Sequence, residues 1–420
     1  MRYYLAVLFT LVAFGLPWVA IQYPDATSSV VRALEDVGSQ LAAVILSHNP
    51  KSIVEIQSKY VAVSTPAAPK VRILIVPGHE PDFGGAEYST LKERDMTVML
   101  ADNLAAFLNR NTHYQVFQTR SYHSWNPDFE TYFTNSWDDI VAWSKASHAE
   151  FSQLVSAGTV KKSAPVIYHN RAPEKVATHL FGITKWANEN NIDITIHVHF
   201  NDVPGHSRNS PGKNTGFSIY VPQKQYLNST TTKAVAETVF KRLAKYNGVS
   251  DLAGESAGIV EEPDLIAIGV NNTSDAASLL IEYGYIYEPQ FTNPDTQPLA
   301  IQDLAFQTYL GLEDFFGAQA GVSFGYDTLM IPHQWNTTIT KKEAPTEDVF
   351  ALQTALLLEG TYPPSNRSMN DCPRSGTFGP CTKAALDSFQ KKYNITSEKE
   401  IVGPQTLNIL NNLYSVKSIN

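Results

Sequence analysis

The chain has 420 residues, which is too many for one core of ordinary size, so we expect at least two domains. Its hydrophobic content of 43%, with 11% aromatic residues, is sufficient for folded cores and argues against disorder. The formal net charge is -9 and no basic cluster offsets it, which excludes a nucleic-acid partner, because phosphates require a positive surface.

The N-terminal residues are typical of a signal peptide or a membrane anchor. Residues 3–21 form an uncharged, apolar run behind Arg2, and no strong cleavage site follows it. We assign residues 1–24 to this segment and expect membrane contact through it if it stays uncleaved. The rest of the chain should then lie outside the cytoplasm, beginning with a helix and linker over residues 25–69.

The next region shows strands alternating with helices. Strands are expected at residues 71–78, 114–120, 193–200 and 278–285. Helices are expected at residues 92–108, 174–189 and 232–246, where apolar residues recur at helical spacing. We therefore predict an α/β domain over residues 70–315, with a mostly parallel sheet flanked by helices.

After an expected linker at residues 316–344, residues 345–415 contain three helical patterns and predict a separate, small all-α domain. The chain's two cysteines, Cys372 and Cys381, lie there in a segment rich in Pro, Gly, Ser and Asn. In an exported protein such a pair predicts a disulfide bond that closes one loop.

Polar residues at the ends of the expected strands are candidates for a metal site. His79 follows the first strand, Glu93 opens the helix behind it, and His197 and His199 lie on the strand at 193–200. Two histidines and one carboxylate, with a fourth position open, are what a catalytic zinc ion needs. Both strand histidines point to the same face and remain candidates. Glu282, in another apolar run, is a candidate for the base.

These motifs, in order, resemble the catalytic domain of zinc-dependent N-acetylmuramoyl-L-alanine amidases of bacterial cell walls. The resemblance covers residues 71–312 and rests on IVPGHEPDFGGAEYSTLKERDMTVMLADNLAAFL, VFQTR, DITIHVHFND, GFSIYV and SLLIEYGYIYE. It implies that His79, Glu93 and His199 hold zinc and that Glu282 is the catalytic base. His197 would then support a ligand or contact substrate, and it stays the alternate ligand.

The implied reaction is hydrolysis, by zinc-activated water, of the amide between N-acetylmuramic acid and the L-alanine of peptidoglycan stem peptides. Two features depart from the family's pattern. Glu80 and Pro81 follow His79, where the family commonly has a second Gly. Residues 121–170 exceed the family's minimum and contain an expected helix, which we interpret as an inserted cover over the cleft.

Residues 347–412 resemble the small three-helix peptidoglycan-binding domain. The matched positions are Leu352, Gln353, Gly376, Phe378, Gly379, Thr382, Ala385, Phe389, Gln390, Gly403 and Thr406. The expected partner is therefore peptidoglycan, and the expected location is the cell envelope. Two alternatives stay open, a noncatalytic peptidoglycan-binding protein and a zinc peptidase acting on stem peptides.

Overall fold

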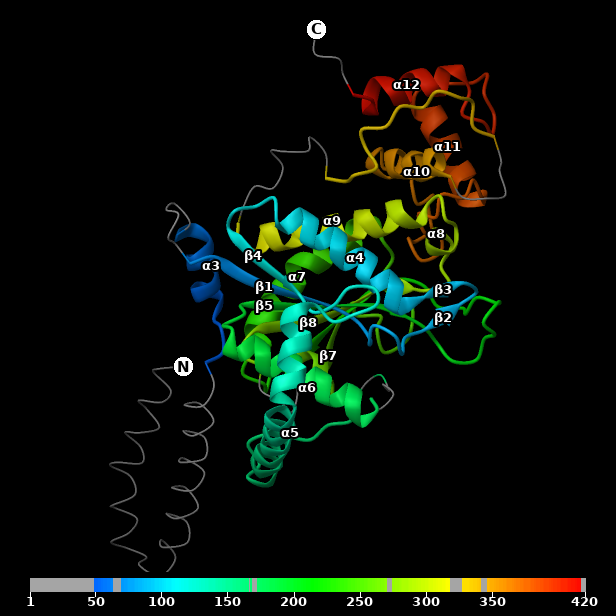
Figure 1. Cartoon of the computed structure of the whole chain (residues 1–420). Coiled ribbons are helices and arrows are strands. Elements are labelled where there is room, and N and C mark those ends of the chain that lie inside the picture. Colours follow the sequence, from blue (N-terminus) through cyan, green and yellow to red (C-terminus); the bar gives the residue numbers. More distant parts are fainter. Residues whose placement is uncertain are drawn as a thin grey trace, which may run out of the picture. The chain divides into compact units, whose positions relative to one another are not determined.

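The computed structural model describes residues 49–62, 69–165, 167, 172–269, 274–317, 327–340 and 346–416 (Figure 1). The expected signal or anchor at residues 1–24 and the helix expected after it lie outside these ranges. Within these ranges, no helix is both long enough and apolar enough to cross a bilayer.

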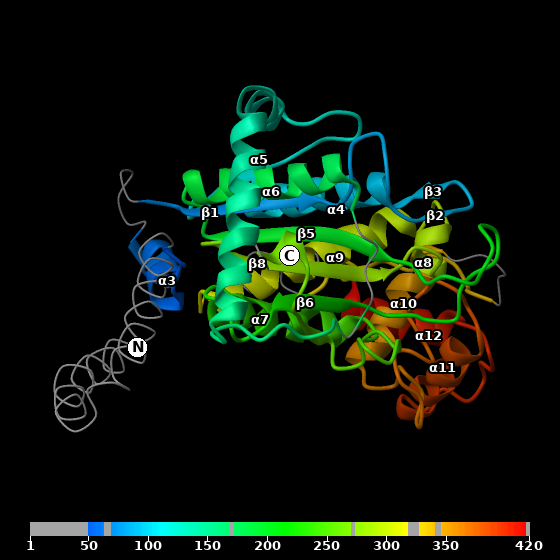
Figure 2. The same cartoon turned by 90° about the horizontal axis from the view of Figure 1, so that it is seen from below.

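A six-stranded sheet forms the centre of the α/β domain, in the order β4-β1-β5-β8-β6-β7. The strands are β1 (Val71–Pro77), β4 (Tyr114–Gln118), β5 (Ile194–Asn201), β6 (Ser218–Pro222), β7 (Ile259–Glu262) and β8 (Ala277–Tyr285). All neighbours are parallel except β6 and β8. Figure 2 shows β1, β5, β8 and β6 running side by side. The predicted fold class is confirmed.

Helices cover both faces of this sheet (Figure 1). On one face Ile73 and Ile75 pack with α4 (Glu93–Leu108), α7 (Ser229–Tyr246) and α9 (Gln297–Phe315). On the other face Leu74 and Val76 pack with α5 (Pro127–Ser156) and α6 (Glu174–Glu189). Because consecutive strand residues point to opposite faces, a strand covered on both sides is expected to be mostly apolar, and β1 is apolar except for Arg72 near its start.

Shorter elements complete the domain. They are α3 (Ile53–Ala62), the hairpin of β2 (Glu87–Tyr88) and β3 (Leu91–Lys92), a 3-10 turn (Ile266–Ile268) and α8 (Pro289–Thr292). The hairpin and β7 were not predicted, because runs of two to four residues carry no readable periodicity. The strand β6 and the helix α9 were not among the expected elements either. The expected helix at 232–246 begins three residues earlier, at Ser229, and the helix inside 121–170 extends over Pro127–Ser156.

Three helices lie in the C-terminal part of the described chain, where the separate domain was expected: α10 (Glu347–Leu358), α11 (Pro380–Lys392) and α12 (Pro404–Tyr414). They share a core of their own that includes Leu352, Phe389 and Leu410. The hydroxyl of Thr346 caps α10 by accepting a hydrogen bond from the Val349 amide at 3.2 Å. The helices α11 and α12 each begin with Gly-Pro, and proline suits the first turn because that turn needs no amide donor.

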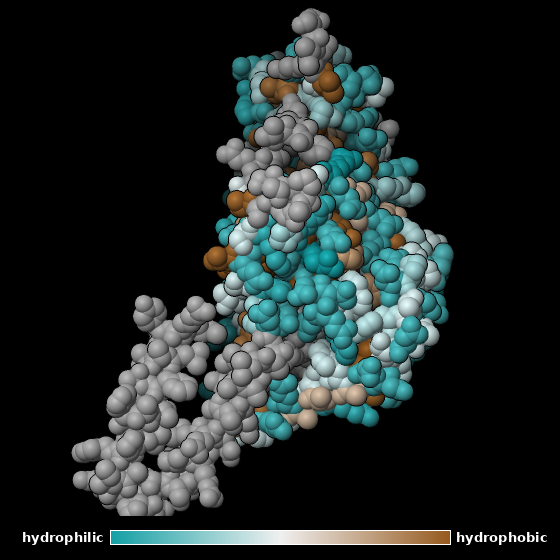
Figure 3. All heavy atoms as spheres, turned by 60° about the vertical axis from the view of Figure 1, so that its left-hand side comes forward, coloured by the Kyte–Doolittle hydropathy of each residue, from teal (hydrophilic) through white to brown (hydrophobic). Residues whose placement is uncertain are grey.

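A disulfide bond joins Cys372 to Cys381 at the start of α11, with Cα atoms 5.8 Å apart. Arg374, close to it in sequence, forms a buried ion pair with Asp303 of α9, Nη2 to Oδ2 at 2.8 Å. Its Nε also donates to the carbonyl of Tyr246 at the end of α7. Hydrophilic residues cover most of the described surface on the face in Figure 3, and hydrophobic ones form small separate spots.

Candidate metal centre

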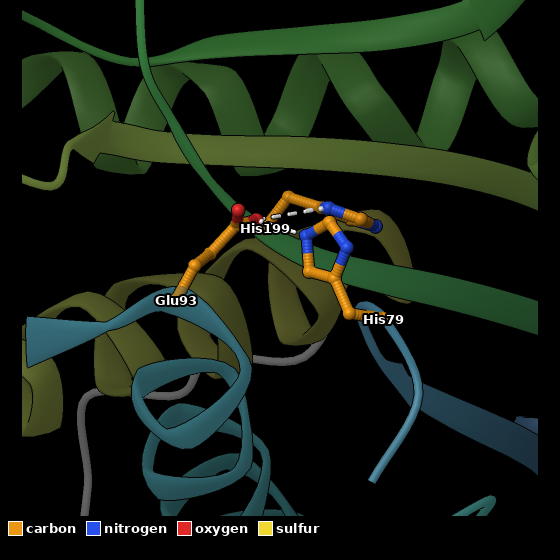
Figure 4. A group of neighbouring side chains, drawn as sticks. All are labelled: His79, Glu93 and His199. Carbon is orange, nitrogen blue, oxygen red and sulfur yellow. Dashed lines mark hydrogen bonds and ion pairs between the residues drawn. The ribbon is translucent and has the colours of Figure 1, made fainter. Parts of the chain in front are cut away.

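The three expected zinc ligands meet at the carboxyl edge of the sheet. His79 follows β1, Glu93 is the first residue of α4, and His199 lies on β5. Their ligand atoms lie within 4.8 Å of one another, and the side chains point toward a common centre (Figure 4). Both rings converge on Oε1 of Glu93, His79 through Nε2 at 2.7 Å and His199 through Nδ1 at 3.1 Å.

The turn after β1 makes this convergence possible. Gly78 lies so close to His199 that a Cβ atom there would be 2.4 Å from Cε1 of the ring, far inside contact distance. His79 itself has φ of 70°, in the left-handed region that non-glycine residues rarely adopt. A residue held in this conformation costs free energy that the surrounding structure must supply, and such residues cluster at functional sites.

Arg120, at the end of the VFQTR segment, fixes that turn. Its guanidinium is fully buried and donates hydrogen bonds to the carbonyls of Pro77 and Gly78 and to the Arg94 carbonyl. Burial lowers the pKa of Arg120 to about 10, so the group stays charged at neutral pH. No pattern in the sequence singled out Arg120, although it lies in one of the matched segments.

Glu93 is held in place as an anion. Its Oε2 accepts a hydrogen bond from the Ala86 amide at 2.8 Å, and its Oε1 accepts one from the Phe200 amide at 3.1 Å. Burial favours a raised pKa, but the nearby His79 and the hydrogen bond from His199 outweigh it and hold the pKa of Glu93 well below its ordinary value.

The ring nitrogens of both histidines are placed to bind a metal ion. Burial lowers the pKa of His199, although its hydrogen bond to Glu93 opposes this. Nε2 of His79 is buried and lacks a hydrogen bond of acceptable geometry among the described residues. Two imidazole rings beside an ionised carboxylate are a typical ligand set for a metal ion, so the three side chains fit a divalent cation.

His197 is not part of this group. Its ring is 2% exposed, and burial lowers its pKa to about 3, while a hydrogen bond with the backbone of Ala267 opposes that shift. The neutral ring is therefore packed inside the domain, one pleat repeat before His199. Its proposed supporting or substrate role stays a prediction.

Glu282 lies on β8 directly opposite His199 in the strand pairing. It lines a cavity of about 840 Å³, together with Glu255, Tyr220, Asn201 and the loop that follows β5. Its Oε2 makes no hydrogen bond within the described part of the chain. Burial, followed by the charges of Glu93 and Glu255, raises the pKa of Glu282 well above its ordinary value.

Glu80, which departs from the family's pattern, is buried and pairs with Nδ1 of His179 at 2.9 Å through both oxygens. This contact ties the loop after His79 to α6. Helix α5, in the segment that we interpreted as a cover, packs against α6, and Ile167 beyond it lines the cavity. Whether that segment gates access remains a hypothesis.

Fold and site together define an α/β protein with a His-Glu-His cluster suited to a metal ion at the carboxyl edge of a mostly parallel sheet. Residues 73–305 match the family described as N-acetylmuramoyl-L-alanine amidase, and the chain belongs to that family. It is therefore a hydrolase, and its substrate is peptidoglycan.

Solved structures of amidases resemble the chain at low identity. The N-acetylmuramoyl-L-alanine amidase of Clostridium difficile 630 is 19% identical, with 60% of this chain and 99% of that chain covered and a TM-score of 0.37. AmiC2 of Nostoc punctiforme is 16% identical, with 59% and 98% covered and a TM-score of 0.37. Ami1 of Mycobacterium smegmatis is 13% identical, with 60% and 100% covered and a TM-score of 0.38. A comparison with curated proteins gave no match.

Proposed function

We propose that His79, Glu93 and His199 hold one catalytic zinc ion and that Glu282 transfers the protons of the reaction. The convergence of both rings on one oxygen of Glu93 supports this proposal, because two imidazole nitrogens and a carboxylate oxygen this close together can bind one cation. When bound, zinc supplies a Lewis acid that acidifies water and stabilises negative charge on the scissile carbonyl oxygen.

Glu282 then acts on the substrate side of the site. Its raised pKa and its free Oε2 suit a group that takes a proton from water and returns it to the leaving amine of L-alanine. The cavity beside it is large enough for several residues of a stem peptide. Glu93, with its lowered pKa, remains an anionic ligand and does not compete for this proton.

We further propose that the C-terminal domain binds peptidoglycan and that the chain works outside the cytoplasm, attached to the membrane if residues 1–24 are uncleaved. The three-helix domain and its disulfide, which suits an oxidising compartment, support this. Binding to insoluble peptidoglycan by the full chain, compared with a chain that ends at residue 344, tests it. Equal binding by both chains would exclude a contribution from the C-terminal domain.

Digestion of purified peptidoglycan, with and without a chelator, tests the catalytic proposal. We expect mass analysis to find peptides with a free L-alanine amino terminus and glycan without peptide, and we expect the chelator to stop their release and added zinc to restore it. Cleavage within the stem peptide would instead identify a zinc peptidase. Zinc binding without any cleavage would indicate a noncatalytic wall-binding protein.

A further inference from the structure

A buried carboxylate that no sequence motif singled out lies beside Glu282. Glu255, in the loop between α7 and β7, is 1% exposed, yet it borders the same cavity as Glu282. Its Oε1 accepts hydrogen bonds from the Tyr220 hydroxyl at 2.5 Å and from the Asn201 side chain at 2.8 Å. Its Oε2 accepts one from the Tyr285 hydroxyl at 3.2 Å.

These three donors come from three strands. Asn201 ends β5, which carries His199, and Tyr285 ends β8, which carries Glu282, while Tyr220 belongs to β6. The pairing of β5 with β8 is irregular just here, since the register shifts between His199 and Asn201. Beyond the shift, Asn201 pairs with Tyr285, and Glu255 binds the side chains of both.

The contacts also indicate what Glu255 does not do. An ionised carboxylate has about four acceptor positions, and three are used inside the protein, so little capacity remains for a ligand. Burial and the charge of Glu255 raise the pKa of Tyr285 and of Tyr220, so both phenols stay protonated and continue to donate. A carboxylate in this position acts on its neighbours and not on the substrate.

We propose that Glu255 is a positioning residue for the amidase reaction, which locks β5, β6 and β8 together beyond the irregular pair so that His199 and Glu282 face the same bond. This inference rests on the roles proposed above for His199 and Glu282. Groups that orient metal ligands and catalytic side chains typically contribute 10- to 100-fold to activity or metal affinity.

The chain offers a matched control for a test. Glu313, on α9, is 3% exposed and accepts hydrogen bonds from two tyrosines and one asparagine, as Glu255 does. Its donors are Tyr60 at 2.9 Å, Tyr114 at 2.6 Å and Asn111 at 3.0 Å. Tyr114 begins β4, so Glu313 lies at the opposite edge of the sheet from the candidate zinc site.

The experiment compares Glu255→Gln with Glu313→Gln in the full chain at saturating zinc, with thermal unfolding and amidase kinetics measured for both. We expect similar losses of thermal stability, but a kcat at least about tenfold lower for Glu255→Gln, with KM changed less than about twofold. A kcat ratio between the variants below about threefold, or an effect on KM alone, overturns the proposal. If Glu255→Gln does not fold, Tyr285→Phe and its control Tyr114→Phe replace the pair under the same criteria.

Titration with Co²⁺, read from its visible absorption, separates this proposal from the proposed function. We expect Glu255→Gln to weaken cobalt affinity about tenfold relative to Glu313→Gln, because Asn201 follows His199 by two residues. If the wild-type chain binds cobalt and releases no amino termini, the amidase mechanism fails. In that case the cobalt affinities of the two variants are the test of the positioning role of Glu255, and equal affinities overturn it.

Discussion

Replacing Gly78 with alanine should weaken metal binding and activity while the domain stays folded. The new Cβ atom would lie 2.4 Å from Cε1, 2.6 Å from Nε2 and 2.7 Å from Nδ1 of His199, whereas ordinary contacts begin at 3.4 Å. Either the ring of His199 or the backbone at residue 78 must therefore move by about 1 Å, which disturbs the contact between His199 and Glu93. A misplacement of about 1 Å in a catalytic group typically costs about 100-fold in rate, which corresponds to about 2.7 kcal/mol.

The assay is a zinc titration against a competing chelator, combined with kcat/KM on a soluble muramyl peptide and thermal unfolding. The control is Gly379→Ala at the start of α11, where the new Cβ atom has no neighbour within 4 Å. We expect the control to keep wild-type zinc affinity and kcat/KM. A Gly78→Ala chain with wild-type zinc affinity and kcat/KM would refute the idea that the close approach of this backbone holds His199 in place.

Three further predictions concern single side chains. Glu282→Gln should keep its zinc, measured by metal analysis, and lose turnover, and retained turnover would remove Glu282 from the mechanism. Asp303→Ala leaves Arg374 charged and buried without its partner carboxylate, and it should lower the free energy of unfolding, measured with urea, by about 3–5 kcal/mol. The control Glu400→Ala removes an exposed ion pair and should lower that free energy by at most about 1 kcal/mol. Burial raises the pKa of Glu262 from 4.5 to about 7. The protonated carboxyl group therefore makes its full contribution to the free energy of unfolding below pH 4.5, and this contribution is lost as the pH rises to about 7. In urea titrations between pH 4.5 and about 7, Glu262→Gln should remove this loss of unfolding free energy. An unchanged pH dependence in the variant would contradict the raised pKa of Glu262.

A large part of the α/β domain could be predicted from sequence because several of its elements are strongly patterned, although the 19-residue helix α9 was missed. The run that forms β1 is apolar from Ile73 onward since both of its faces are covered, and α6 spans the range that its helical spacing indicated. The short strand β7 has four residues and is defined by its parallel pairing with β6, so its own sequence carried no comparable signal. Strand order likewise depends on contacts between distant segments.

The candidate site, like the fold, could be predicted from sequence only in part. Residue types and spacing by themselves singled out His79, Glu93 and Glu282, because zinc chemistry uses few side chains and parallel sheets collect them at one edge. The choice between His197 and His199 could not be made from alternation, since both point to one face of β5. Their surroundings differ in three dimensions: one ring is buried beside the Ala267 backbone and the other meets Glu93.

Glu255 and Arg120 became visible only in the folded chain. Each acts through hydrogen bonds to groups far away in sequence, Glu255 to three strands and Arg120 to the turn after β1. Local sequence determined which segments are strands and helices and which residues have the chemistry for a metal site. The tertiary structure alone decided which side chains meet, because burial and hydrogen bonding are properties of the packed whole and not of any one segment.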